Sequence, residues 1–98
     1  MSAFDIARID DVIHGRLRLG IMAYLANSEV ADFNELKSAL QATQGNLSIH
    51  LRKLEDAGYI AIEKSFLARK PLTRARITAA GRKAFAAYLE AIGKLIEG

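Results

Sequence analysis

The sequence predicts a mainly α-helical domain with one small β-hairpin, in the order α-α-α-β-β-α. Apolar residues recur at helical spacing in four segments, and an extended segment with the single proline separates the third helix from the fourth. The chain has 98 residues, of which 51% are hydrophobic. We expect one domain over residues 1–98, because a second core of ordinary size would not fit.

The first helix is expected to run from Asp10, as its N-cap, to Asn27, where the apolar pattern ends. A surface helix of a monomer needs only one apolar stripe, so two adjacent stripes predict packing on both sides of this helix. The first stripe holds Ile13, Leu17, Ile21, Tyr24 and Leu25, and the second holds Val12, Leu19, Met22 and Ala26.

A short helix and a longer helix follow, separated by a tight turn. Asp32 and Glu35 have the spacing of a capping box, which predicts a helix that starts after Asp32 and ends near Ala42. Thr43 is then the expected N-cap of the longer helix, which covers Gln44 to Ala57.

The longer helix has the clearest end signal in the chain. Gly58 stands where a left-handed residue is needed after a helix, and Tyr59 can close over Leu54 in a Schellman motif. The buried face of this helix is predicted to consist of Leu47, Leu51 and Leu54.

The hairpin comes next, over about residues 59–77. Its first strand is expected at Tyr59 to Ile62, its turn at Ala68 to Leu72, and the end of its return strand at Ile77. Pro71 is expected to prevent regular ladder pairing near the turn. Since a two-stranded hairpin is marginally stable alone, it must lie against the helices.

Thr78 is the expected N-cap of the last helix, over Ala79 to Glu97. This helix is very apolar for so small a domain, which predicts that it packs on a partner. We expect a homodimer interface formed by about residues 79–97 together with the first helix. The alternative is a helix that packs only on its own core. The proposed contact seam has nearly heptad spacing and consists of Phe85, Leu89, Ile92 and Ile96.

Basic residues are concentrated in one part of the chain. The formal net charge is +3, from 14 Lys and Arg against 11 Asp and Glu. The stretch from Lys64 to Lys83 contains bases and no acid, so the acids all lie in the rest of the chain. Such a basic block is the electrostatic footprint of a polyanion-binding protein, and its alternative is a solvated surface loop.

A short helix, a tight turn and a longer helix form a helix-turn-helix over about residues 32–57, whose second helix enters the major groove of DNA. The basic hairpin directly after it would be the wing. The fold expected from this arrangement is a winged helix-turn-helix.

The run FNELKSALQATQGNLSIHLRKLEDAGYIAIEKSF, followed by RKPLTRARITAAGRKAF, resembles the small single-domain winged-helix transcriptional regulators of the MarR/ArsR type. The resemblance covers roughly residues 10–96 and implies a cytosolic, dimeric, DNA-binding protein. The cysteine clusters of metal-sensing relatives are missing here. The most specific matching positions are Asn46, Leu47, Ser48, His50, Leu51, Leu54, Gly58, Tyr59, Lys64, Pro71, Thr73, Thr78 and Gly81.

The longer helix should present a DNA-reading face opposite its buried leucines. In this face Arg52 can read guanine with two hydrogen bonds, Asn46 can read adenine, and Ile49 can meet a thymine methyl group. Gly45 lets the helix N-terminus approach a phosphate. The alternative is an ordinary solvated face. The expected DNA contacts of this helix are Gly45, Asn46, Ser48, Ile49, Arg52 and Lys53.

The wing is expected to contact phosphates or the minor groove through Arg69 and Lys70 at its tip, and through Arg74 beside them. Arg74 and Arg76 share one strand face, so the alternative for one of them is to cover apolar surface with its stem. His50 lies one step from the buried leucines, where it either contacts a phosphate or, as we favour, is half-buried and bonded to the backbone.

Several classes of function find no support in the sequence. With two histidines and no cysteine, neither a metal site nor a cofactor is expected. There is no glycine-rich phosphate loop and no nucleophilic serine elbow, so the protein is not expected to be an enzyme. No apolar run reaches the ~18 residues of a membrane span, and no signal-peptide pattern precedes residue 11, so a cytoplasmic location is expected.

The sequence therefore predicts a homodimeric transcriptional regulator that binds double-stranded DNA sequence-specifically. The alternative is a winged-helix protein–protein interaction module without DNA binding, in which the basic hairpin meets an acidic partner. A small-molecule effector, held between the first and last helices, is compatible with the regulator.

Overall fold

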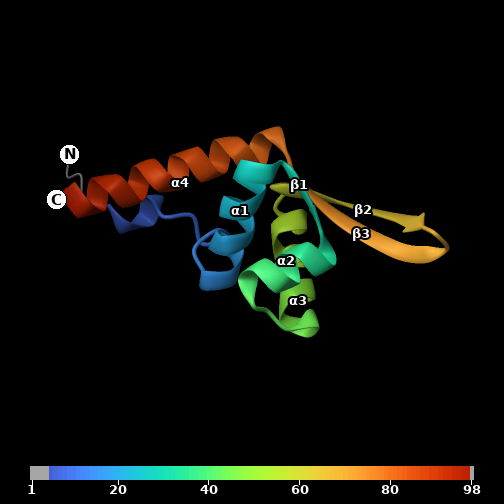
Figure 1. The fold of residues 1–98 in the computed structure, drawn as a ribbon. Coiled ribbons are helices and arrows are strands. Elements are labelled where there is room, and N and C mark those ends of the chain that lie inside the picture. The colour runs from blue at the N-terminus through green and yellow to red at the C-terminus, as the bar shows by residue number, and fades with distance from the viewer. Residues whose placement is uncertain (1–4, 98) are drawn as a thin grey trace.

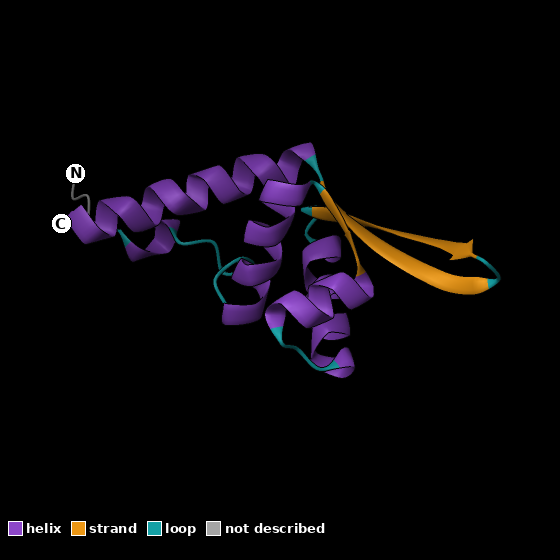
Figure 2. Ribbon diagram, viewed as in Figure 1, coloured by secondary structure: helices purple, strands orange, loops and turns teal. Residues whose placement is uncertain are grey.

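The computed structural model describes residues 5–97, so the ends of the predicted domain, residues 1–4 and 98, lie outside the described residues. A long C-terminal helix lies across the helical body, and a β-hairpin projects from the body (Figures 1 and 2). The elements in chain order are the 3-10 turn η1 (Ile6–Arg8), α1 (Arg16–Ser28), β1 (Val30–Asp32), α2 (Phe33–Leu40), α3 (Gln44–Asp56), β2 (Ile60–Leu67), β3 (Lys70–Ile77) and α4 (Ala79–Glu97).

The predicted fold class is confirmed, with one additional strand. β1 pairs with β3 in an antiparallel ladder from Val30 opposite Arg76 to Asp32 opposite Arg74, which gives the sheet order β1-β3-β2. The sequence did not predict β1, because three residues are too few to show a strand period.

The predicted start of the first helix was wrong. The carboxylate of Asp10 accepts hydrogen bonds from the backbone N–H groups of Val12 and Ile13, at 2.8 and 3.2 Å, and so closes a turn rather than capping a helix. Gly15 has an extended backbone, with φ 174°, and α1 begins after it at Arg16. Ile13 lies before the helix but is fully buried. Its place in the apolar pattern therefore made the helix seem to start earlier than it does.

The predicted caps of the next two helices are confirmed. The backbone N–H of Glu35 donates to Asp32 at 2.8 Å, and the Glu35 side chain completes the capping box. The hydroxyl of Thr43 accepts from the backbone N–H of Asn46 at 3.2 Å. These two caps hold α2 and α3 at either side of a short turn that includes Gln41 in a left-handed conformation, with φ 51°.

The predicted Schellman motif at the end of α3 is also confirmed. Gly58 has φ 80°, and the Tyr59 N–H donates to the Leu54 carbonyl at 3.0 Å. The Gly58 N–H donates to the Glu55 carbonyl at 2.9 Å. The glycine thereby turns the chain directly from α3 into β2.

The hairpin is longer and more regular than predicted. Its loop consists of Ala68 and Arg69, both with positive φ, and Lys70 and Pro71 belong to β3. The prediction that Pro71 prevents ladder pairing was wrong, since Pro71 lies opposite Phe66 in the ladder. In such a loop the closing pair is the hydrogen-bonded one, so Pro71 falls in the next, non-hydrogen-bonded pair. Its missing N–H therefore faces away from β2, on the side where β1 has already ended.

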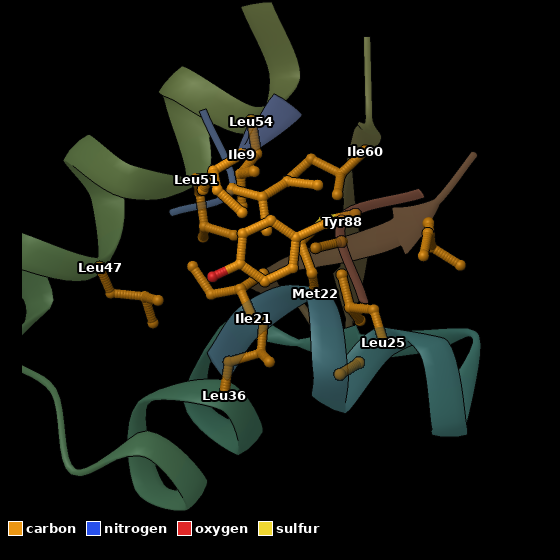
Figure 3. Close-up of a cluster of buried hydrophobic side chains, with 14 of the residues drawn as sticks. Ile9, Ile21, Met22, Leu25, Leu36, Leu47, Leu51, Leu54, Ile60 and Tyr88 are labelled. Carbon is orange, nitrogen blue, oxygen red and sulfur yellow. The ribbon is translucent and has the colours of Figure 1, made fainter. Parts of the chain in front are cut away.

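The core lies where α1, α3, α4 and the base of the sheet meet (Figure 3). The three predicted leucines of α3 are all buried in it, and within residues 5–97 no buried side chain is polar or charged. This core fixes the base of the hairpin beside α3. Its members are Ile9, Ile13, Ile21, Met22, Leu25, Ala31, Leu36, Leu47, Leu51, Leu54, Ile60, Ala75, Ile77, Tyr88 and Ala91.

α4 starts in close contact with the end of α3. Its predicted N-cap is confirmed: the Thr78 hydroxyl accepts from the Gly81 N–H at 2.9 Å and donates to the Gly58 carbonyl at 2.7 Å. The Thr78 N–H donates to the Tyr59 carbonyl at 3.0 Å. At Gly81 a Cβ atom would lie only 2.0 Å from that carbonyl oxygen, so this approach requires glycine.

Candidate nucleic-acid interface

The outer face of α3 is solvent-exposed along its whole length, as the helical spacing predicts. Since the leucines of α3 point into the core, the opposite face turns outward. Ile49 is 56% exposed at the middle of this face, and nothing lies within 4 Å of a Cβ atom built on Gly45 in the first turn. The exposed residues include all those expected to contact DNA: Gly45, Asn46, Ser48, Ile49, Arg52 and Lys53.

A groove of about 340 Å³ separates this face from the hairpin. Ser48 and Arg52 of α3 line one side of the groove, and Lys64 and Thr73 of the hairpin line the other. The structure therefore brings part of the predicted α3 face and the base of the wing together. The complete lining is Phe33, Gln44, Ser48, Leu51, Arg52, Glu55, Ile62, Lys64 and Thr73.

Lys64 is the basic residue of the groove lining that the sequence did not predict as a DNA contact. It belongs to the basic block, but only the strand register shows that it faces α3. Residues directly opposite each other in an antiparallel ladder share one face, and residues two apart along a strand do so too. Lys64 lies opposite Thr73 and two residues beyond Ile62, and all three line the groove.

The other face of the hairpin holds Arg74 and Arg76, so the structure separates Arg74 from the groove. Arg74 lies opposite Glu63 on β2 and opposite Asp32 on β1. Arg76 forms ion pairs with Glu29, at 3.7 Å, and with Glu63, at 3.6 Å. Their shared face is confirmed, but acids surround it, and a DNA contact by Arg74 stays a prediction without support from the groove geometry.

Arg69 and Lys70 lie exposed at the tip of the hairpin, which extends well beyond the helical body (Figure 1). The salt bridges found within residues 5–97 both involve Arg76. Within that part of the chain, Arg52, Lys64, Arg69 and Lys70 form no ion pair within 4 Å, although Glu55 lines the same groove as Arg52 and Lys64.

His50 is bonded to a side chain, so the predicted hydrogen bond of His50 to the backbone was wrong. Nη1 of Arg18 lies 2.9 Å from Nδ1 of His50, and the same guanidinium donates to the Val12 carbonyl at 2.5 Å. A guanidinium can only donate, so Nδ1 accepts and the ring proton resides on Nε2. Partial burial, together with the charges of Arg18 and Lys53, lowers the pKa of His50 from 6.5.

Two partly buried hydrogen bonds of tyrosine hydroxyls tie the segment before α1 to the rest of the fold. The Tyr59 hydroxyl donates to Asp10 at 2.5 Å, and this hydrogen bond raises the pKa of Tyr59 to about 12, with partial burial adding to the effect. His14 Nδ1 lies 2.9 Å from the Tyr88 hydroxyl of α4. His14 thus joins the segment before α1 to α4, whereas His50 joins α3 to α1.

α4 carries two neighbouring apolar faces. Tyr88 and Ala91 are buried against the core, whereas Leu89 is 51% and Ile96 81% exposed. The predicted seam is therefore divided, because Phe85 and Ile92 pack partly against the core and Leu89 and Ile96 face solvent. A homodimer through this face stays a prediction.

Two cavities lie beside the hairpin in the described part of the chain. The groove beside α3 and a smaller cavity of about 150 Å³ at the start of α2 both adjoin the hairpin, and neither lies between α1 and α4, where the sequence was compatible with an effector. Within residues 5–97 no three His, Asp or Glu side chains form a possible metal site. No helix in that part of the chain has the length and apolar character needed to cross a membrane.

Known proteins match most of the length of this chain. An uncharacterized protein of Methanocaldococcus jannaschii is 38% identical over 84 residues, which cover 86% of this chain and 91% of the relative. The solved structure of a transcriptional regulator homologue protein from Pyrococcus horikoshii OT3 is 32% identical, with a TM-score of 0.82, and the match covers 89% of this chain and 86% of that one.

A crystal structure of an ArsR family transcriptional regulator has the same fold at 20% identity, with a TM-score of 0.60 over 95% of this chain and 91% of that one. A family model described as a winged helix DNA-binding domain matches residues 17–96, which include the helix-turn-helix, the hairpin and nearly all of α4. The chain belongs to the winged helix DNA-binding domain family.

Proposed function

We propose that the protein is a transcriptional regulator that binds double-stranded DNA sequence-specifically as a homodimer. The observation that carries this proposal is the common groove of α3 and the hairpin, in which Arg52 and Ser48 lie across from Lys64 and Thr73. A helix face and a basic hairpin on one side of a domain can engage a major groove and the adjacent backbone together.

The side chains of this surface fall into two groups, those that read base edges and those that bind phosphates. Arg52 offers a planar fork of donors for a guanine edge, and Asn46 offers a donor and an acceptor for an adenine edge. Ile49, which is 56% exposed, suits the methyl group of thymine. These contacts read sequence, whereas Lys53, Lys64, Arg69 and Lys70 supply charge that phosphates of any sequence attract.

The Arg18–His50 pair leaves His50 free to add one contact to the DNA phosphates. Because Arg18 holds the Nδ1 atom, the Nε2–H of a neutral His50 remains as a donor on the flank of α3. A phosphate oxygen can accept this hydrogen bond. His50 therefore contributes to positioning rather than to base readout.

The dimer uses the solvent-facing part of α4. Leu89 and Ile96 leave apolar surface exposed next to the buried Tyr88 and Ala91, which suits a second copy of α4. Two copies would place their α3 helices in successive major grooves about 34–36 Å apart on a pseudo-palindromic site.

The test is a comparison of Arg52→Ala with Lys53→Ala on two DNA duplexes. One duplex is recovered by the wild-type protein from a random pool, and the other is its scrambled sequence. We expect Arg52→Ala to weaken binding to the recovered duplex by about 1–3 kcal/mol and binding to the scrambled duplex much less. Lys53→Ala should weaken binding to both duplexes alike.

Fluorescence anisotropy titrations at fixed salt measure both effects. Equal losses on the two duplexes for Arg52→Ala would assign Arg52 to the backbone and remove the base-reading role. If no duplex binds and an acidic protein partner binds instead, the fold serves as an interaction module and the proposed function is wrong.

A further inference from the structure

Two large apolar side chains lie exposed next to the basic tip of the hairpin. Phe66 is 75% exposed and Leu67 is 65% exposed. Single exposed apolar residues are common on proteins. These two, however, stand on a projecting hairpin whose next residues include Arg69 and Lys70, so no part of residues 5–97 covers them.

The strand register distinguishes the two side chains. Phe66 lies two residues beyond Lys64 on β2 and opposite Pro71 on β3, which puts it on the face of the hairpin that lines the groove. Leu67, one residue further on, belongs to the opposite face, with its ladder partner Lys70 and with Arg74 and Arg76. A ligand that fills the groove and continues toward the tip would meet Phe66 and Pro71.

We infer that Phe66, backed by Pro71, is an apolar wedge that enters the minor groove of DNA and bends the duplex. This inference rests on the proposed function, because it assumes that DNA lies along the groove. The charge of the hairpin tip favours this occupant, since no acid occurs between Lys64 and Lys83. The acids that line the adjoining cavities come from other elements: Glu55 lines the groove, and Asp32 lines the smaller cavity together with Pro71. A second copy of the hairpin would instead bring two basic tips together, and like charges repel.

The chemistry of the tip matches what a bending protein needs. Apolar side chains inserted at a base step partly unstack it, and neighbouring basic side chains hold the phosphates on either side. The cost of unstacking is lowest at pyrimidine–purine steps such as TA and CA. The wedge therefore adds a preference for a flexible step at a position where no side chain reads a base edge.

Phe66→Ala and Leu67→Ala form a matched pair for the test. Both replace an exposed apolar residue near the tip, and only the first lies on the groove face. The probe is a duplex of about 30 base pairs recovered from a random pool, with a donor and an acceptor dye at its ends. A second version carries 2-aminopurine at the flexible step, where its fluorescence rises when bases unstack.

Wild-type protein and Leu67→Ala should shorten the end-to-end distance and raise the 2-aminopurine signal. Phe66→Ala should abolish both changes and weaken binding about tenfold. It should leave the slope of log affinity against log salt unchanged, because it removes no charge. Circular dichroism melting should give the same Tm for all three proteins, since both side chains are exposed.

The outcomes separate the wedge from the function on which it rests. If wild-type protein binds with a clear salt slope but Phe66→Ala bends DNA as well as Leu67→Ala does, the wedge is overturned and DNA binding stands. If wild-type protein shows no salt-dependent binding to any recovered duplex, the proposed function fails and the wedge fails with it.

Discussion

Replacing Gly81 by alanine should destabilise the protein, although alanine is the better helix former. In an exposed helix interior, Gly→Ala stabilises by about 1 kcal/mol. At position 81, however, the new Cβ would lie 2.0 Å from the Tyr59 carbonyl oxygen and 3.1 Å from Cγ1 of Ile77. The oxygen is backbone, and it already accepts a hydrogen bond from Thr78, so it has little freedom to move.

The expected size follows from these two opposed effects. To restore an ordinary contact, the start of α4 must move away from Tyr59 by about 1 Å or more, and overpacking of this kind costs about 1–3 kcal/mol or more. The shift also weakens the hydrogen bonds at Thr78. We therefore expect a net loss of about 2 kcal/mol, which corresponds to a fall of roughly 8–16 °C in Tm for a domain of this size.

Gly93→Ala is the matched control, because Gly93 lies in the same helix and nothing is within 4 Å of its added Cβ. It should be neutral or stabilising by up to about 1 kcal/mol. Thermal and urea unfolding, followed by circular dichroism at one protein concentration, measure both variants. A Gly81→Ala protein as stable as Gly93→Ala would refute the close approach of α4 to Tyr59.

Three further predictions concern charge, protonation and assembly. Replacing Arg69 and Lys70 together by alanine should reduce the slope of log affinity against log salt equally on all duplexes, because phosphate contacts carry no base information. An unchanged slope in anisotropy titrations would contradict phosphate binding by the hairpin tip. Because burial lowers the pKa of His50 from 6.5, the folded state is the harder one to protonate, and stability should fall as the pH drops from 6.5 through that lowered pKa. Urea unfolding between pH 5 and 8 should show a weaker decline for His50→Gln, and identical pH profiles would contradict this. Leu89→Glu should shift the protein toward a monomer in sedimentation equilibrium with its helical content unchanged, since Leu89 is 51% exposed; an unaltered mass would place the dimer interface elsewhere.

Local signals in the sequence predicted α2, α3 and α4 well. The capping box at Asp32, the N-cap at Thr43 and the left-handed Gly58 depend on residues within one turn of the chain, so their chemistry can be read without the fold. The outward orientation of Arg52 follows in the same way, because the buried leucines of α3 fix the helix rotation.

Features that depend on contacts between distant segments could not be predicted. The turn before α1 is tied to the fold by the hydrogen bond from the Tyr59 hydroxyl to Asp10, two residues that are 49 positions apart in the chain. The face on which Arg74 lies depends on the register of β2 and β3, and one residue of register reverses it. The partner of His50 is Arg18, which is 32 residues away in the chain.

The central claim is that α3 and the hairpin together bind a DNA double helix. The salt dependence of DNA binding tests this claim most directly. If each protomer of a dimer neutralises about four phosphates, the slope of log affinity against log salt should be about −7. Titrating the wild-type protein with the recovered duplex over a series of salt concentrations gives this slope. A slope close to zero, or affinity that does not require a duplex, would contradict the claim.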